Sequence, residues 1–65
     1  MSTTASIEKI QRRLDRTCGE LFDVAAAFSA DGKEVHALLT RRLVEDCRNM
    51  LWQVCELNAA LDGEQ

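Results

Sequence analysis

The sequence predicts an all-α protein, an antiparallel two-helix hairpin, on three observations. The 65 residues contain no proline, three glycines and only three aromatic residues, Phe22, Phe28 and Trp52, which disfavours a small β-sandwich. Apolar residues recur in steps of three and four over two long stretches. A single break, at residues 29–32, separates the two stretches. Residues 1–65 are therefore expected to form one helical-hairpin domain.

The first helix is expected over about residues 4–29, with the hydroxyl of Thr3 or Thr4 as its N-terminal cap. Its apolar stripe has a period near 3.5, the heptad period of helices that pack along their length. Gly19 costs about 1 kcal/mol relative to alanine in a straight helix, so we interpret it as a kink or a place of close backbone approach. The stripe consists of Ile7, Ile10, Leu14, Thr17, Leu21, Val24 and Phe28.

The second helix is expected over about residues 33–61, after a turn at about 30–32. Asp31 is expected to cap it, with Glu34 three residues later completing a capping box. A glycine stop and a short acidic tail follow at 62–65. The stripe of this helix consists of His36, Thr40, Leu43, Cys47, Met50, Val54, Leu57 and Leu61, with Val35 and Leu39 on one shoulder and Val44, Leu51 and Cys55 on the other.

The apolar arc of the second helix is too wide for one helical neighbour. A helix pair buries one narrow stripe on each helix, so the shoulder residues need a third or a fourth helix. A second copy of the chain supplies them most simply, because twofold dimers are the commonest oligomers, and two hairpins then form a four-helix bundle. A different protein is the alternative partner. The residues expected in the core or the dimer interface are Ile7, Ile10, Leu14, Leu21, Phe28, Leu43, Cys47, Met50, Leu51, Val54, Leu57 and Leu61.

Charge and cysteine content indicate the setting of the chain. The formal net charge of -3 disfavours non-specific nucleic-acid binding driven by overall charge. The longest membrane-like run, residues 24–30, is far shorter than the about 20 residues that cross a bilayer, and residues 1–6 do not resemble a signal peptide. An odd number of cysteines without a C-x-x-C pair is typical of a reducing compartment. We therefore expect a cytoplasmic protein without membrane contact, and a Cys18–Cys47 bridge only in a secreted one.

One face of the first helix is basic, and it consists of Lys9, Arg12, Arg13 and Arg16 at i, i+3, i+4 and i+7. Such a face binds phosphates or an acidic protein surface. The simpler interpretation is a solvated face, because Glu8 and Glu20 stand at i,i+4 spacing from two of the arginines. No aromatic residue lies among the cations to stack on bases, which disfavours single-stranded nucleic acid.

A second outward face lies on the second helix, opposite the stripe, and it consists of Leu38, Arg41, Glu45, Arg48 and Trp52. A tryptophan flanked by arginines and a leucine has the composition of an interface hot spot. We predict that this face binds a partner protein. The alternative is that Trp52 lies in the core of a dimer interface.

No pattern in the sequence is typical of a catalytic or metal site. His36 is the single histidine, and no cysteine stands at ligand spacing from it, so we expect a boundary residue and no metal ligand. The sequence contains no glycine-rich phosphate loop and no recognisable Ser/His/Asp arrangement. A hairpin is also expected to lack the pocket of about 300 Å³ that small-molecule sites need.

The sequence therefore predicts a small non-enzymatic interaction module, without a cofactor or a small-molecule substrate. It acts as a regulator, inhibitor, chaperone or assembly subunit by binding another protein through its helical faces. RNA or DNA binding through the basic face of the first helix is the alternative function.

Overall fold

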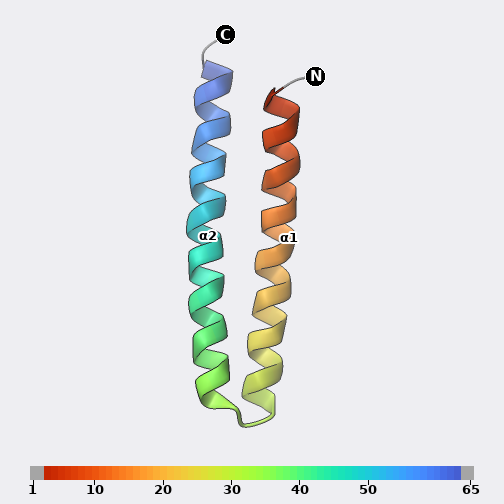
Figure 1. Ribbon diagram of the computed structural model, residues 1–65, viewed down its shortest axis with the longest axis vertical. Coiled ribbons are helices and arrows are strands. Elements are labelled where there is room, and N and C mark those ends of the chain that lie inside the picture. The colour runs from red at the N-terminus through yellow and green to blue at the C-terminus, as the bar shows by residue number, and fades with distance from the viewer. Residues whose placement is uncertain (1–2, 64–65) are drawn as a thin grey trace.

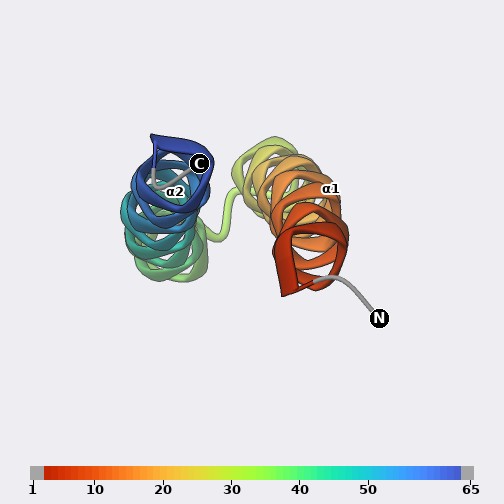
Figure 2. The same cartoon turned by 90° about the horizontal axis from the view of Figure 1, so that it is seen from above.

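The computed structural model describes residues 3–63, which form two α-helices joined by a tight turn. α1 spans Thr3–Ala30 and α2 spans Glu34–Gly63. The helices run antiparallel and side by side, and the start of α1 and the end of α2 lie at the end of the pair opposite the turn (Figure 1). The end-on view shows no third element over either broad side of the described pair (Figure 2). The two-helix hairpin expected from the sequence is confirmed.

Gly32 ends α1. Its φ of +76° lies in the left-handed region that glycine adopts without steric cost. The N–H of Lys33 donates to the carbonyl oxygen of Phe28 at 2.9 Å, and the N–H of Gly32 donates to that of Ser29 at 3.1 Å. These two hydrogen bonds form a Schellman motif, which satisfies carbonyl groups left over at the end of the helix.

Asp31 belongs to the end of α1, so its expected role as the cap of α2 is wrong. Its N–H donates to the carbonyl oxygen of Ala27 at 3.1 Å and continues the hydrogen bonding of α1. The first bond of α2 runs from the N–H of Ala37 to the carbonyl oxygen of Lys33, which makes Lys33 the N-cap residue. At its other end α2 continues to Gly63, beyond the expected end at 61, and residues 64–65 of the expected tail lie outside the described residues.

The helices contact each other through a heptad repeat, in which we label the facing positions a and d and the other positions accordingly. All a and d residues are buried or half-buried, and the six most buried have small or medium side chains: Cys18, Ala25, Ala37, Thr40, Val44 and Cys47. In α1 the a residues are Thr4, Gln11, Cys18 and Ala25, and the d residues are Ile7, Leu14, Leu21 and Phe28. In α2 the a residues are Ala37, Val44, Leu51 and Asn58, and the d residues are Thr40, Cys47, Val54 and Leu61.

The stripes expected from the sequence consist of the d and g residues of each helix. In the structure the residues that face the other helix are those at a and d, so the d residues were predicted correctly and the g residues were not. The small a residues Cys18, Ala25 and Ala37 let the two helices approach closely, since the axis separation depends on the side chains between them. Val44 and Leu51, expected on a shoulder, lie in the interface. The g residues are exposed: Ile10, Thr17 and Val24 on α1, and His36, Leu43, Met50 and Leu57 on α2.

Gly19 does not mark a close approach within the hairpin. α1 continues unbroken through it, and no atom lies within 4 Å of the place where a Cβ would stand. A close backbone approach at Gly19 is therefore not made by the described residues of this chain.

Candidate interaction surfaces

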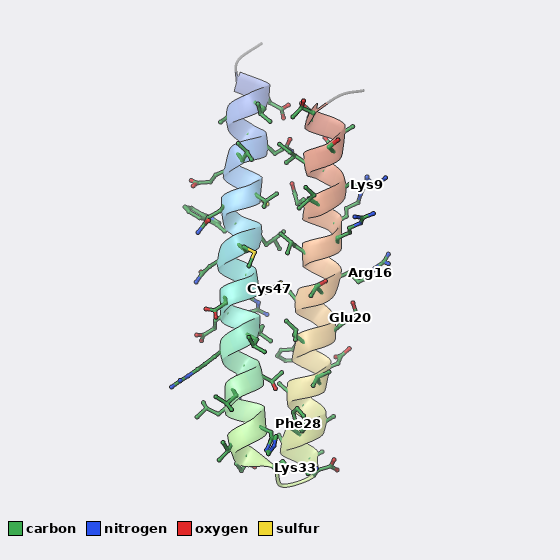
Figure 3. The ribbon with its side chains drawn as sticks, viewed as in Figure 1. Lys9, Arg16, Glu20, Phe28, Lys33 and Cys47 are labelled. Atoms are coloured by element: carbon green, nitrogen blue, oxygen red, sulfur yellow. The ribbon has the colours of Figure 1, made fainter. Side chains whose placement is uncertain are left out.

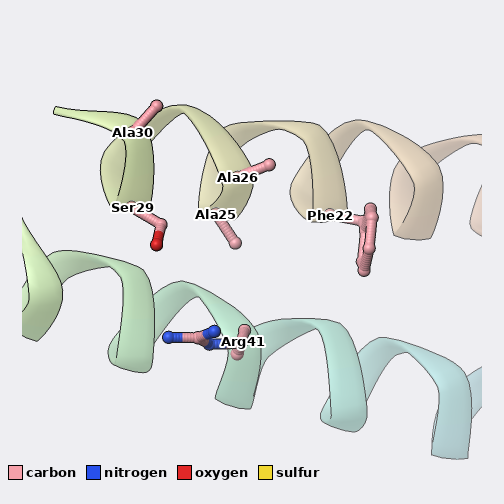
Figure 4. A pocket seen from close by; sticks show the side chains of 6 residues that line it. All are labelled: Phe22, Ala25, Ala26, Ser29, Ala30 and Arg41. Carbon is pink, nitrogen blue, oxygen red and sulfur yellow. The ribbon is translucent and has the colours of Figure 1, made fainter.

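The hairpin has two unlike broad sides. Because the helices run in opposite directions, the g residues of both fall on one side and the e residues of both on the other. Surface hollows agree with this assignment, since Arg41 at an e position of α2 lines the same hollow as Phe22 and Ser29 at e positions of α1 (Figure 4).

The g side is apolar. Its six central residues are all exposed, and the leucines and the methionine are about half exposed. We call these six residues the apolar face: Ile10, Thr17, Val24, Leu43, Met50 and Leu57. Within the two described helices, none of the g positions holds an Asp, Glu, Lys or Arg. The register, with Cys18 opposite Cys47, arranges the apolar face in three rungs. The rungs pair Ile10 with Leu57, Thr17 with Met50, and Val24 with Leu43.

The e side is charged instead, with Glu8, Asp15, Glu34, Arg41, Arg48 and Asp62. It contains two open grooves of about 360 and 380 Å³. Phe22, 55% exposed, lines both grooves between the two helices. The expectation that a hairpin lacks a hollow of this volume is therefore wrong.

Two thiols meet in the middle of the interface. Cys18 and Cys47 are both 7% exposed, and the Sγ of Cys47 donates a hydrogen bond to the carbonyl oxygen of Leu14 at 3.6 Å. Burial, followed by the hydrogen bond with the Cys47 thiol, raises the pKa of the Cys18 thiol to about 11. Cys55 is half-buried, and all three cysteines are free.

A polar pair lies in the interface toward the end opposite the turn, and it was not predicted from the sequence. Gln11 and Asn58 occupy a positions, and each has a buried side-chain oxygen without a hydrogen-bond partner in the described part of the chain. They line a hollow of about 270 Å³ together with Glu8 and Arg12. The available signal was heptad spacing, since Gln11 stands seven residues before Cys18 and Asn58 seven residues after Leu51.

The four cations of the basic face are brought together as predicted, and we call them the basic stripe. All are exposed, and they alone line a hollow of about 260 Å³ on the outer side of α1. Lys9 and Arg16 point away from α2 (Figure 3). Among the described residues, no ion pair joins Arg12 to Glu8 or Arg16 to Glu20, although the spacing permits both.

The outward face predicted on α2 is divided by the structure. Leu38, Glu45 and Trp52 occupy b positions on the outer surface, and Trp52 is 63% exposed, so it lies outside the hairpin core. Arg41 and Arg48 occupy e positions and line the grooves beside α1.

His36 lies at the turn, where its ring centroid is 5.3 Å from that of Phe28 at an interplanar angle of 44°. It is exposed and stands at a g position. Over residues 3–63 no group of three or more His, Cys, Asp or Glu side chains is placed to hold a metal ion.

Comparisons with known proteins found no match to the chain, whether among family models, curated proteins or solved structures. Neither described helix is long and apolar enough to cross a membrane.

Proposed function

We propose that the chain is a protein-interaction module that binds another helical protein surface through the apolar face. The observation that supports this most is the contrast between its two broad sides, one uncharged and half exposed, the other charged. An extended apolar patch on a small soluble protein marks a binding surface. The free cysteines fit the expected cytoplasmic setting.

The heptad pattern supports the same proposal. The positions a, d and g are all largely apolar, which is the wide stripe of a helix with more than one helical neighbour. Within the hairpin each helix has a single neighbour, and that neighbour covers a and d. A partner helix packed along g would bury the rest of the stripe. The chain then works without a catalytic step, by holding or masking the surface that it binds.

The test measures whether the apolar face is covered. Met50→Cys, in a chain that also has Cys55→Ser, places one accessible thiol on the face. Glu45→Cys in the same background places a thiol on the outer surface of α2 as the matched control. We expect a small alkylating reagent, applied to cells that produce each chain, to modify the thiol at 50 at least tenfold more slowly than the thiol at 45. Equal rates at both positions would contradict the proposed function.

A second candidate function, polyanion binding by the basic stripe, is favoured by the four cations that stand together without an ion pair to any residue over 3–63. Phosphate contacts release condensed counterions, so such binding weakens steeply with salt. We expect Arg12→Glu with Arg16→Glu to abolish retention on duplex RNA or DNA. Arg41→Glu with Arg42→Glu makes the same charge change on α2 and is the control. Retention that is insensitive to salt, or that survives the first pair of changes, would contradict this candidate.

A further inference from the structure

We propose that a second copy of the chain covers the apolar face, with the two turns at opposite ends of a four-helix bundle. This inference rests on the proposed function and names the partner. In this arrangement α1 packs against α1 of the second copy and α2 against its α2. The twofold axis passes between the two Thr17 residues and between the two Met50 residues.

The first argument is surface area. The chain exposes 5102 Å², whereas a folded monomer of 7.3 kDa exposes about 4200 Å². The excess of about 900 Å² is close to the roughly 800 Å² that each partner contributes to a standard interface. The Cα radius of gyration of 15.0 Å likewise exceeds the about 11 Å of a compact 65-residue domain. A second hairpin on the apolar face would cover the excess area.

The second argument is the symmetry of the apolar face. Ile10 and Val24 each stand seven residues from Thr17, and Leu43 and Leu57 each stand seven residues from Met50. A twofold axis through the central rung therefore places Ile10 opposite Val24 of the second copy and Leu43 opposite Leu57. A twofold interface needs a surface that is complementary to itself, and this spacing meets that requirement.

The third argument concerns the direction of the second copy. A twofold axis that joins two apolar faces has two orientations. One runs along the rod, places both turns at the same end and packs α1 against α2 of the second copy. The other runs across the rod, places the turns at opposite ends and packs each helix against its equivalent. Both orientations match the rungs, so the apolar residues alone do not choose between them.

Charged residues beside the apolar face make the choice. The c positions next to it hold Arg13 and Glu20 on α1, and Asp46 and Gln53 on α2, all exposed. With the turns at opposite ends, Arg13 stands opposite Glu20 of the second copy, twice by symmetry, and Asp46 stands opposite Gln53. With the turns at the same end, Glu20 stands opposite Asp46 of the second copy, twice. Opposite charges favour the first arrangement and like charges disfavour the second.

Charge reversal at Glu20 tests the arrangement by the sign of its effect. With opposite turns, Glu20→Arg faces Arg13 of the second copy and raises the dimer dissociation constant about tenfold. With turns at the same end, it faces Asp46 and lowers that constant. We expect Arg13→Glu to weaken the dimer as well, and the double variant Arg13→Glu with Glu20→Arg to regain it. Arg16→Glu makes the same charge change as Arg13→Glu on the outer side of α1 and is the control for that variant.

A cross-link provides an independent readout. Thr17→Cys, in a chain with Cys55→Ser, places two thiols at the axis of the opposite-turn dimer, and oxidised glutathione is expected to join them into a covalent dimer. The same-end arrangement places residue 17 opposite residue 50 and gives no such product. A tighter dimer of the Glu20→Arg chain without this cross-link overturns the orientation. A monomer at every concentration overturns the second copy as partner, whereas protection of position 50 in cells tests the proposed function separately.

Discussion

Cys18 of α1 and Cys47 of α2 lie opposite each other at the middle of the helix interface, both buried, and the Sγ of Cys47 donates a hydrogen bond across the interface to the carbonyl oxygen of Leu14. Small side chains at this layer let the helices come close. A helix with a single neighbour buries only its a and d residues, so the larger apolar residues at g stay outside the pair. They form the exposed apolar face on which the proposed function depends.

The raised pKa of the Cys18 thiol predicts that the hairpin loses stability in alkali. The ordinary value of 9.0 applies to the unfolded chain, and the folded value is about 11. Between these values the unfolded state releases a proton that the folded state keeps, so the free energy of unfolding falls as pH rises from about 9 to 11. Chemical denaturation over this range measures the slope. Cys18→Ala is expected to flatten it, and an unchanged slope in that variant would contradict the assignment.

Thiol reactivity should follow burial. Cys55 is half-buried, whereas Cys18 and Cys47 are each 7% exposed. We expect an alkylating reagent at neutral pH to modify one thiol per chain rapidly, and peptide mapping to place it at Cys55. Cys55→Ser should remove this fast phase. Modification of Cys18 at the rate of Cys55 in the folded chain would be inconsistent with the structure.

Gly19→Ala is expected to stabilise the hairpin by about 1 kcal/mol, because alanine has the higher helix propensity. The added methyl group meets no atom within 4 Å, so it introduces no clash. Thermal or urea unfolding measures the gain. A loss of stability would mean that another surface packs against this side of α1, in disagreement with a partner on the g side.

Replacing the polar pair of the interface should also stabilise the chain. Asn58→Leu removes a buried amide oxygen that has no hydrogen-bond partner and adds apolar contact, with an expected gain of about 1 kcal/mol. Gln11→Leu should act in the same direction. Asn49→Leu, on the exposed outer side of α2, is the control and should change the free energy of unfolding little. A loss of stability in both interface variants would mean that these amides are satisfied in solution.

The hairpin itself was predictable from sequence, since steps of three and four on either side of a single glycine turn permit little else. The sequence did not predict which of two overlapping stripes, a with d or d with g, faces the other helix. Choosing the larger side chains selected Ile10 and Leu43, whereas contact between two helices favoured the smaller Cys18 and Ala37. Hydrophobicity ranks residues by size, but a close helix pair requires small ones. In the proposed four-helix bundle both sets are buried.

At the turn and on the outward faces, too, some features follow from the sequence and others depend on how the two helices pack. Asp31 fits the sequence pattern of an N-cap of α2. In the structure α1 ends in a left-handed Gly32, and the N–H of Asp31 makes one of the last hydrogen bonds of α1. The basic stripe followed directly from its spacing, because the outer side of a helix has no neighbour to rearrange it. The periodicity of α2 alone places Arg41 and Arg48 on its outward face. They line the grooves beside α1 instead, which depends on where α1 packs against α2.

The central claim, that a second copy of the chain covers the apolar face, is tested most directly by native mass over a concentration series. The wild-type chain is predicted to form a dimer of twice its 7.3 kDa. Met50→Glu is predicted to be a monomer with unchanged helix content, and Trp52→Glu, on the opposite side of α2, is predicted to remain a dimer. A wild-type chain that stays at 7.3 kDa throughout, or a Met50→Glu chain that still dimerises, would contradict the account.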